Sequence, residues 1–120
     1  MNYTISRRDA KMMVGKGWSK LIDRIYDAKP RSIHMLQIKE KWGGLRAYCG
    51  GATMEFFDVI DQAEEESYTI CEECGQPGIL REDLGWILTL CDEHYVTHNR
   101  NKGELIDRAH ELIKKVGKDE

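Results

Sequence analysis

The pattern C-x2-C-x16-C-x2-H occurs once in the chain, formed by Cys71, Cys74, Cys91 and His94. Two ligands that are separated by two residues can bind one ion, and a spacer of hairpin length can bring the second pair back to the first. Thiolates together with an imidazole are ligands that zinc prefers in a tetrahedral site. Because protein groups fill all four positions, we expect a structural Zn²⁺. His98 is the alternative to His94, and redox use of Cys71 and Cys74 is the alternative to metal binding.

The length and the cysteine content indicate one domain in a reducing compartment. A chain of 120 residues has room for a single core, residues 1–120, and a metal ion would add to its stability. The zinc-binding part is expected to span residues 68–98. Four cysteines without an N-terminal apolar run, and no stretch near the ~18 apolar residues of a membrane span, favour a cytoplasmic protein without membrane contact. Cys49 lies outside the pattern and is expected to be a small buried hydrophobic residue.

Charged residues are distributed unevenly, which the formal net charge of −3 conceals. Residues 1–48 contain eleven Lys or Arg and four Asp or Glu, a balance of +7. Residues 49–94 contain one basic and twelve acidic residues, a balance of −11. Such a separation either steers a charged partner toward the protein or lets two parts of one fold attract each other. The sequence is compatible with both interpretations.

Helical periodicity occurs in four segments. Ser6 followed by Asp9 resembles the N-terminal cap of a short helix that Gly15 and Gly17 end. The other three segments have apolar residues at intervals of three and four. These residues are Trp18, Leu21, Ile22, Ile25 and Tyr26, then Phe56, Phe57, Ile60 and Ala63 within residues 54–67, and finally Leu105, Ile106, Ala109, Leu112, Ile113 and Val116.

Two hairpins are predicted between the helices. Residues 32–42 form one strand, residues 45–49 form the next, and Gly43 and Gly44 make the turn. The second hairpin lies between the two ligand pairs, with alternating apolar residues along its returning strand at Trp86, Leu88 and Leu90. We therefore expect an α+β fold, in which helices pack a short antiparallel β-hairpin sheet, followed by a zinc-ribbon-like hairpin and a C-terminal helix.

The first hairpin carries the best candidate for a partner-binding site. Lys39, Lys41 and Arg46 flank Trp42, and an aromatic ring among cations suits a phosphate backbone or an acidic protein surface. In the alternative, Trp42 covers the core while the cations lie in water or face the acidic helix at 55–66. The solvent exposure of the Trp42 side chain distinguishes these two interpretations.

The string IKEKWGGLRAYCGG and the later segments CEECGQPG and GWILTLCDEH resemble a group of small, largely uncharacterised proteins common in bacteriophages and prophages. The likeness covers roughly residues 17–98, and it implies a phage or mobile-element origin and a zinc site, with no established activity. A weaker likeness is to TraR/DksA-like zinc fingers, which bind RNA polymerase. His94 stands where those proteins have a cysteine, and a β-hairpin replaces their helical arm.

Three classes of function compete. We favour a non-enzymatic, zinc-stabilised binding or regulatory protein that docks on a host macromolecule, foremost a protein, with inhibition of a host defence system as one mode of action. The alternative is a nucleic-acid-binding or RNA polymerase-binding transcription modulator, and the acidic pI near 5.8 counts against nucleic acid. An HNH-type nuclease would need a histidine between its knuckles, and residues 75–90 contain none. Without a nucleophile, phosphate-loop or metalloprotease motif, no catalytic residue is predicted.

Overall fold

The computed structural model describes residues 4–100 and confirms the α+β fold. Its elements are α1 (Arg7–Met13), the 3₁₀ helix η1 (Lys16–Trp18), α2 (Ser19–Ala28), β1 (His34–Lys41), β2 (Gly44–Gly50), α3 (Met54–Ser67), β3 (Ile79–Arg81) and β4 (Leu88–Leu90). Residues 92–100 are also helical. The helix predicted from Leu105 to Val116 lies outside the described residues.

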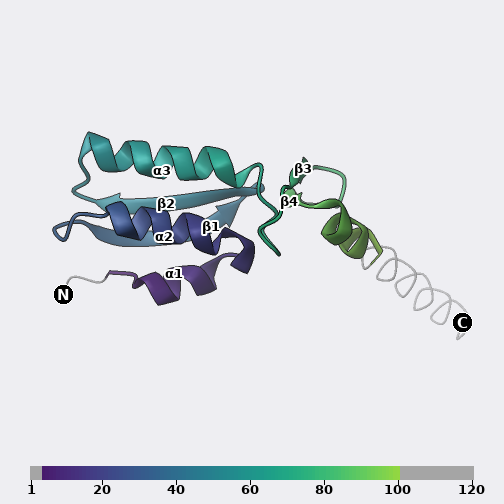
Figure 1. The fold of residues 1–120 in the computed structure, drawn as a ribbon, viewed down its shortest axis with the longest axis horizontal. Helices are drawn as coiled ribbons and strands as arrows, with labels where there is room; N and C mark the ends of the chain where they lie inside the picture. Colours follow the sequence, from purple (N-terminus) through teal and green to yellow (C-terminus); the bar gives the residue numbers. More distant parts are fainter. Residues whose placement is uncertain (1–3, 101–120) are drawn as a thin grey trace, which may run out of the picture.

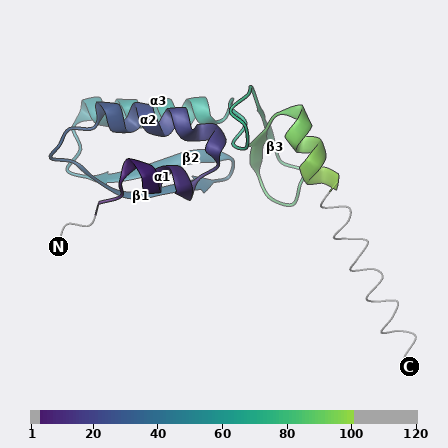
Figure 2. The same ribbon diagram turned by 60° about the horizontal axis from the view of Figure 1, so that its bottom comes forward.

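Residues 4–67 form a layer of helices on a two-stranded sheet. Helix α2 runs between α1 and α3, over the sheet made by β1 and β2 (Figure 1). The metal hairpin β3–β4 and the helix after it lie beyond one end of this sheet, as both views show (Figure 2). Within residues 4–100, no helix combines the length and the apolar character needed to cross a membrane.

The core lies between the helices and one face of the sheet. The predicted apolar stripe of α2 is buried, and Trp18, Ile22 and Ile25 are completely inaccessible to solvent. In α3 the buried residues are Phe56, Ile60, Ala63 and Ser67. The prediction that Phe57 also faces the core was wrong, because its side chain is 46% exposed. The stripe of α3 is narrow, and a residue one position from Phe56 is rotated by about 100° onto its edge.

The first hairpin turns one residue earlier than predicted. Lys41 pairs with Gly44, so Trp42 and Gly43 form a two-residue turn in which both have positive φ, 53° and 82°. Positive φ at both central positions defines the turn that matches the twist of a hairpin. Gly44 is the first residue of β2, where a Cβ would lie 2.5 Å from the hydroxyl oxygen of Tyr68.

The metal hairpin has its own small core. Leu84, Leu88 and Leu90 are buried with Cys71, and Tyr95 packs against them. The returning strand is shorter than predicted, because β4 begins at Leu88. Trp86 precedes it and is 55% exposed, directly after the turn residue Gly85.

Candidate metal centre

Cys71, Cys74, Cys91 and His94 come together into one cluster. Their four ligand atoms all lie within 4.8 Å of one another. The Sγ atoms of Cys74 and Cys91 are 3.8 Å apart, and the Nδ1 atom of His94 lies 3.6 Å from the Sγ of Cys71 and 3.1 Å from that of Cys91. The predicted ligands therefore surround a common point, and this arrangement can hold a metal ion.

The distances between these atoms fit a tetrahedral zinc ion. Zinc binds sulfur at about 2.3 Å and nitrogen at about 2.0–2.1 Å, so a tetrahedron requires S···S separations of about 3.8 Å and S···N separations of about 3.5 Å. The S···S distance between Cys74 and Cys91 and the S···N distance between Cys71 and His94 agree with these values, and the Cys91–His94 distance of 3.1 Å is shorter. The donor set, three thiols and one imidazole, is the one that a structural zinc site uses.

The histidine of the cluster is His94, which presents its Nδ1 atom. His98 lies one helical turn further, and its Nε2 atom is 3.4 Å from a carboxylate oxygen of Glu73. Both residues belong to the helix at 92–100, which therefore supplies the fourth ligand from its first turn. Of the two candidates, the structure brings only His94 to the cysteines.

A tight turn presents the first two cysteines. The N–H of Gly75 donates to the carbonyl of Cys71 at 2.9 Å, and Gly75 has a φ of 82° that favours glycine. The N–H of Cys71 donates to the carbonyl of Gln76 at 2.7 Å. Burial raises the pKa of the Cys71 thiol, but hydrogen bonds from the backbone of Cys91, Glu73 and Cys74 outweigh burial and lower this pKa to about 7. A thiol that deprotonates near neutral pH is a competent metal ligand.

The N-terminal layer packs directly against this turn. The N–H of Gly17 donates to the carbonyl of Glu72 at 2.9 Å, and the indole Nε1 of the buried Trp18 donates to the carbonyl of Ile70 at 2.9 Å. A Cβ on Gly17 would lie 2.6 Å from the nitrogen of Gly75 and nearer still to the carbonyl oxygen of Cys71. Gly17 therefore does more than end a helix, because its missing side chain lets two backbones meet.

The first hairpin packs against the metal hairpin through Thr89. The hydroxyl of this fully buried residue donates to the carbonyl of Gly43 at 2.6 Å. Its N–H donates to the carboxylate of Glu72 at 3.2 Å, and its carbonyl accepts from the N–H of Glu72 at 3.0 Å. Burial raises the pKa of the Glu72 carboxyl to about 7; the hydrogen bond from the N–H of Thr89 offsets part of this rise, and the nearby carboxylate of Glu40 adds to it.

The candidate partner-binding residues of the first hairpin divide into two groups. Trp42 is 66% exposed and does not cover the core. The ammonium group of Lys41 lies 5.0 Å from the centre of the Trp42 ring, and that of Lys39 lies 5.5 Å from the Tyr48 ring. Arg46, in contrast, forms an ion pair with Glu64 of α3 and donates to the hydroxyl of Tyr68 at 3.1 Å. Lys41 and Trp42 are thus exposed to solvent and Lys39 is half-buried, while Arg46 joins the sheet to α3.

Ion pairs between helices account for part of the charge separation. The guanidinium of Arg24 on α2 pairs with Glu66 on α3, and Arg46 pairs with Glu64. These pairs link the basic half of the chain to the acidic half. On the other side of α2, Asp23 pairs with Lys11 at 2.8 Å and with Arg7 at 3.1 Å, and the hydrogen bond from Lys11 lowers the pKa of Asp23.

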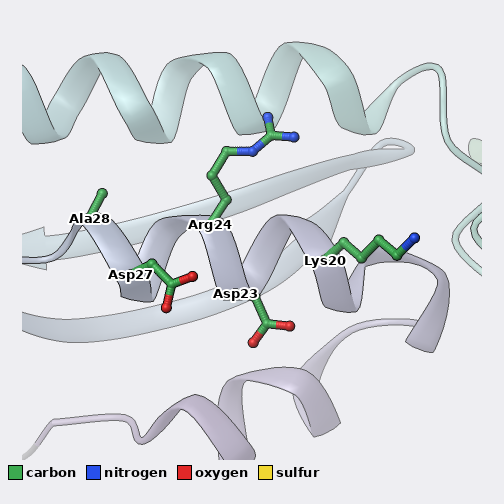
Figure 3. A pocket seen from close by; sticks show the side chains of 5 residues that line it. All are labelled: Lys20, Asp23, Arg24, Asp27 and Ala28. Atoms are coloured by element: carbon green, nitrogen blue, oxygen red, sulfur yellow. The ribbon is translucent and has the colours of Figure 1, made fainter.

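A surface depression lies over these ion pairs. Its volume is about 520 Å³, and residues of one helix, α2, line it (Figure 3). The lining residues are Lys20, Asp23, Arg24, Asp27 and Ala28. Because Asp23, Arg24 and Asp27 are already paired with residues of α1 or α3, this depression is the solvated outer face of a helix and no candidate active site.

Sequence reasoning missed the residues that support the ligands. Thr89 joins the metal hairpin to Gly43 of the first hairpin through a buried hydrogen bond, and Glu72 bonds to the N–H of Thr89 within the metal hairpin. No local pattern marks Glu72 or Thr89. The sequence did contain one signal of a close contact between distant segments, the pair Gly15 and Gly17, because the end of a helix does not require two glycines. Cys49 was predicted to be buried; it is only partly buried, although it packs against the core and burial raises its pKa.

Comparison with known proteins gives no match to a family model, to a curated protein or to a solved structure.

Proposed function

We propose that Cys71, Cys74, Cys91 and His94 bind one structural zinc ion. The observation that carries this proposal is the convergence of all four ligand atoms within 4.8 Å. Because four protein ligands complete a tetrahedron, a substrate or a water molecule has no position on the ion, and the ion serves stability. Ligands that are far apart in sequence become ordered when the metal closes the loop, so the energy of metal binding becomes energy of folding.

Metal analysis of the purified protein tests this proposal. We expect one equivalent of zinc per chain, and a sharp fall in melting temperature on addition of a chelator. Cys74→Ser should abolish stoichiometric binding. Cys49→Ser is the matched control, since Cys49 is not part of the cluster, and this variant should retain its zinc. Substantially less than one equivalent in the wild type, or equal loss in both variants, would refute the zinc site.

We further propose that the protein acts by binding another macromolecule and has no catalytic activity of its own. Its contact surface consists of Lys39, Lys41, Trp42 and Tyr48, hereafter the hairpin surface. An exposed tryptophan and an exposed tyrosine are typical anchors of protein interfaces, and the two lysines favour an acidic partner. With the resemblance to phage and prophage proteins, this surface supports a host protein as the partner, with inhibition of a defence system as one mode of action.

A nucleic acid is the second candidate partner, because the same cations and rings suit a single strand. Lysines neutralise phosphates, and exposed aromatic rings stack on bases. This candidate predicts a steep loss of affinity with salt. Binding of a labelled single-stranded RNA or DNA oligonucleotide, measured by fluorescence anisotropy at two salt concentrations, tests it directly.

Capture from a host lysate, with and without nuclease treatment, tests the hairpin surface. The variant Lys39→Glu/Lys41→Glu should lose the captured partner and keep its melting temperature, because Lys41 is exposed, Lys39 is half-buried, and charges in contact with solvent contribute little to stability. The matched control is Arg8→Glu/Arg31→Glu, which reverses two exposed charges elsewhere and should retain the partner. A partner held equally by both variants would exclude the hairpin surface. Nuclease-sensitive capture would favour the nucleic-acid candidate.

A further inference from the structure

We propose that the metal site controls the conformation of the turn at Trp42 and Gly43, so that the hairpin surface takes its binding shape only when the metal is bound. This inference rests on the proposed function, since it concerns the ion and the surface proposed there. It makes partner binding dependent on zinc through Thr89, a positioning residue that belongs to neither site.

The turn at Trp42 and Gly43 has a backbone conformation that is unfavourable for one of its two residues. Trp42 has a φ of 53°, and the left-handed conformation costs a residue with a Cβ roughly 1–2 kcal/mol. The side chain of Trp42 is 66% exposed, so its own packing recovers only part of this cost. Contacts of the neighbouring Gly43 must therefore help to hold the turn.

Most of the contacts of Gly43 come from the metal hairpin. Its carbonyl accepts the hydroxyl of Thr89 at 2.6 Å, and a Cβ at this position would lie 2.5 Å from the Cδ1 atom of Leu80 and 3.3 Å from the Cγ2 atom of Ile87. The hairpin's own contribution is the carboxylate of Glu40, which accepts the N–H of Gly43 at 2.6 Å. Within its own sheet the turn is held by the bond from Gly43 to Glu40 and by the pairing of Lys41 with Gly44, and the metal hairpin adds the bond from Thr89.

The position of Thr89 depends on the ligand pairs. Thr89 stands two residues before Cys91, and both its N–H and its carbonyl bond to Glu72, which follows Cys71. The strands β3 and β4 have three residues each, and a hairpin of this length is not stable alone. Without the metal, the two segments that hold Thr89 lose the crosslink between them. The bond to Gly43 would then lose its fixed donor.

Fluorine NMR of the full chain, labelled with 5-fluorotryptophan, reports the turn directly. The chain has three tryptophans, and Trp42→Phe identifies the resonance of Trp42. We expect that resonance to be narrow in the zinc-loaded protein, and to shift toward the position of a flexible tryptophan when a chelator removes the metal. Trp18, completely buried in the N-terminal core, serves as the internal reference for unfolding.

Two variants of Thr89 distinguish the loss of its hydrogen bond to Gly43 from a change in the overall fold. Thr89→Val keeps the size of the side chain and removes the donor, so the Trp42 resonance should move in the chelator's direction while zinc stays bound and Trp18 stays in place. Thr89→Ser keeps the hydroxyl and should leave Trp42 near its wild-type position. Because zinc is present in both variants, this comparison holds even if chelation unfolds the whole chain.

The outcomes distinguish this inference from the proposed function. A Trp42 resonance that is unchanged in Thr89→Val overturns the coupling, even if zinc and partner both bind. A protein that binds no zinc refutes the metal site and the coupling together. A coupled Trp42 in a protein whose captured partner ignores Lys39→Glu/Lys41→Glu leaves the coupling intact and refutes the hairpin surface as the place of binding.

Discussion

Replacing Gly17 by alanine should destabilise the protein, although alanine suits the backbone at this position. Gly17 belongs to a 3₁₀ helix and is not among the glycines with positive φ, so the backbone itself tolerates a Cβ. The obstacle is the neighbouring chain. An ordinary contact needs 3.4 Å, whereas a Cβ would lie 2.0 Å from the carbonyl oxygen of Cys71, so the two segments must separate by about 1.4 Å.

The magnitude follows from the bonds that this separation affects. Forcing an extra methyl group into a packed interface costs roughly 1–3 kcal/mol. The bond from the N–H of Gly17 to the carbonyl of Glu72, 2.9 Å long, would lengthen to about 4.3 Å if it took up the whole shift, and its loss adds about 1 kcal/mol. We expect a loss of about 2–4 kcal/mol, which for a domain of this size lowers the melting temperature by about 10 °C or more.

Denaturant unfolding of the zinc-loaded protein measures this loss, and Gly50→Ala is the matched control. A Cβ on Gly50 would meet only the Cδ1 atom of Leu36, at an ordinary 3.6 Å, so this variant should change stability by less than about 1 kcal/mol. Competition with a chromophoric chelator should show weaker zinc retention in Gly17→Ala alone. Equal unfolding midpoints for the two variants would refute the close packing of residues 15–17 on the metal turn.

Three more predictions follow from buried or charged contacts. Trp18→Phe removes the indole N–H that Ile70 accepts and should cost about 1–3 kcal/mol in denaturant unfolding; an unchanged midpoint would show that this bond contributes nothing. A double-mutant cycle with Arg46→Met and Glu64→Gln should give a coupling energy of about 1 kcal/mol, since both side chains are only partly exposed; a value near zero would show that α3 does not need the pair. Lowering the pH from about 7.5 to about 5 should release zinc, because the cysteine thiols and the histidine imidazolium must lose a proton before they can bind the ion. A zinc-sensitive dye should report this release in the wild type. The same dye should detect no stoichiometric zinc in Cys74→Ser.

Features that depend on local repeats could be predicted from the sequence. The spacing of the four ligands, the apolar stripe of α2 and the bounds of α3 each reflect the geometry of one short segment. The turn was predicted one residue late because two adjacent glycines, Gly43 and Gly44, give the same signal, and a tryptophan with positive φ is energetically disfavoured. Sequence cannot tell that one glycine serves the turn and the other leaves room for Tyr68.

Contacts between distant segments could not be predicted. The bond from Gly17 to Glu72 joins two backbone groups, which every residue possesses, and the bond from the Thr89 hydroxyl to Gly43 ends on a backbone carbonyl, so neither imposes a pattern on the sequence. The cations near Trp42 were predicted as one group, but the long side chain of Arg46 reaches Glu64. Which cation stays in solvent depends on the path of α3, and this path is a property of the tertiary fold.

The separation in sequence between bonded residues also suggests an order of assembly. Cys71 and His94 are 23 residues apart, whereas Trp18 and Ile70 are 52 apart and Gly43 and Thr89 are 46 apart. Closing the loop between Trp18 and Ile70 costs roughly 0.7 kcal/mol more in conformational entropy than closing the loop between Cys71 and His94. Binding of the metal would also offset the entropic cost of closing the loop between its own ligands. The ligand loop can therefore close first during folding and offer a finished backbone surface to the N-terminal layer. A cell that limits zinc would then delay the whole chain at an early step, long before any partner is met.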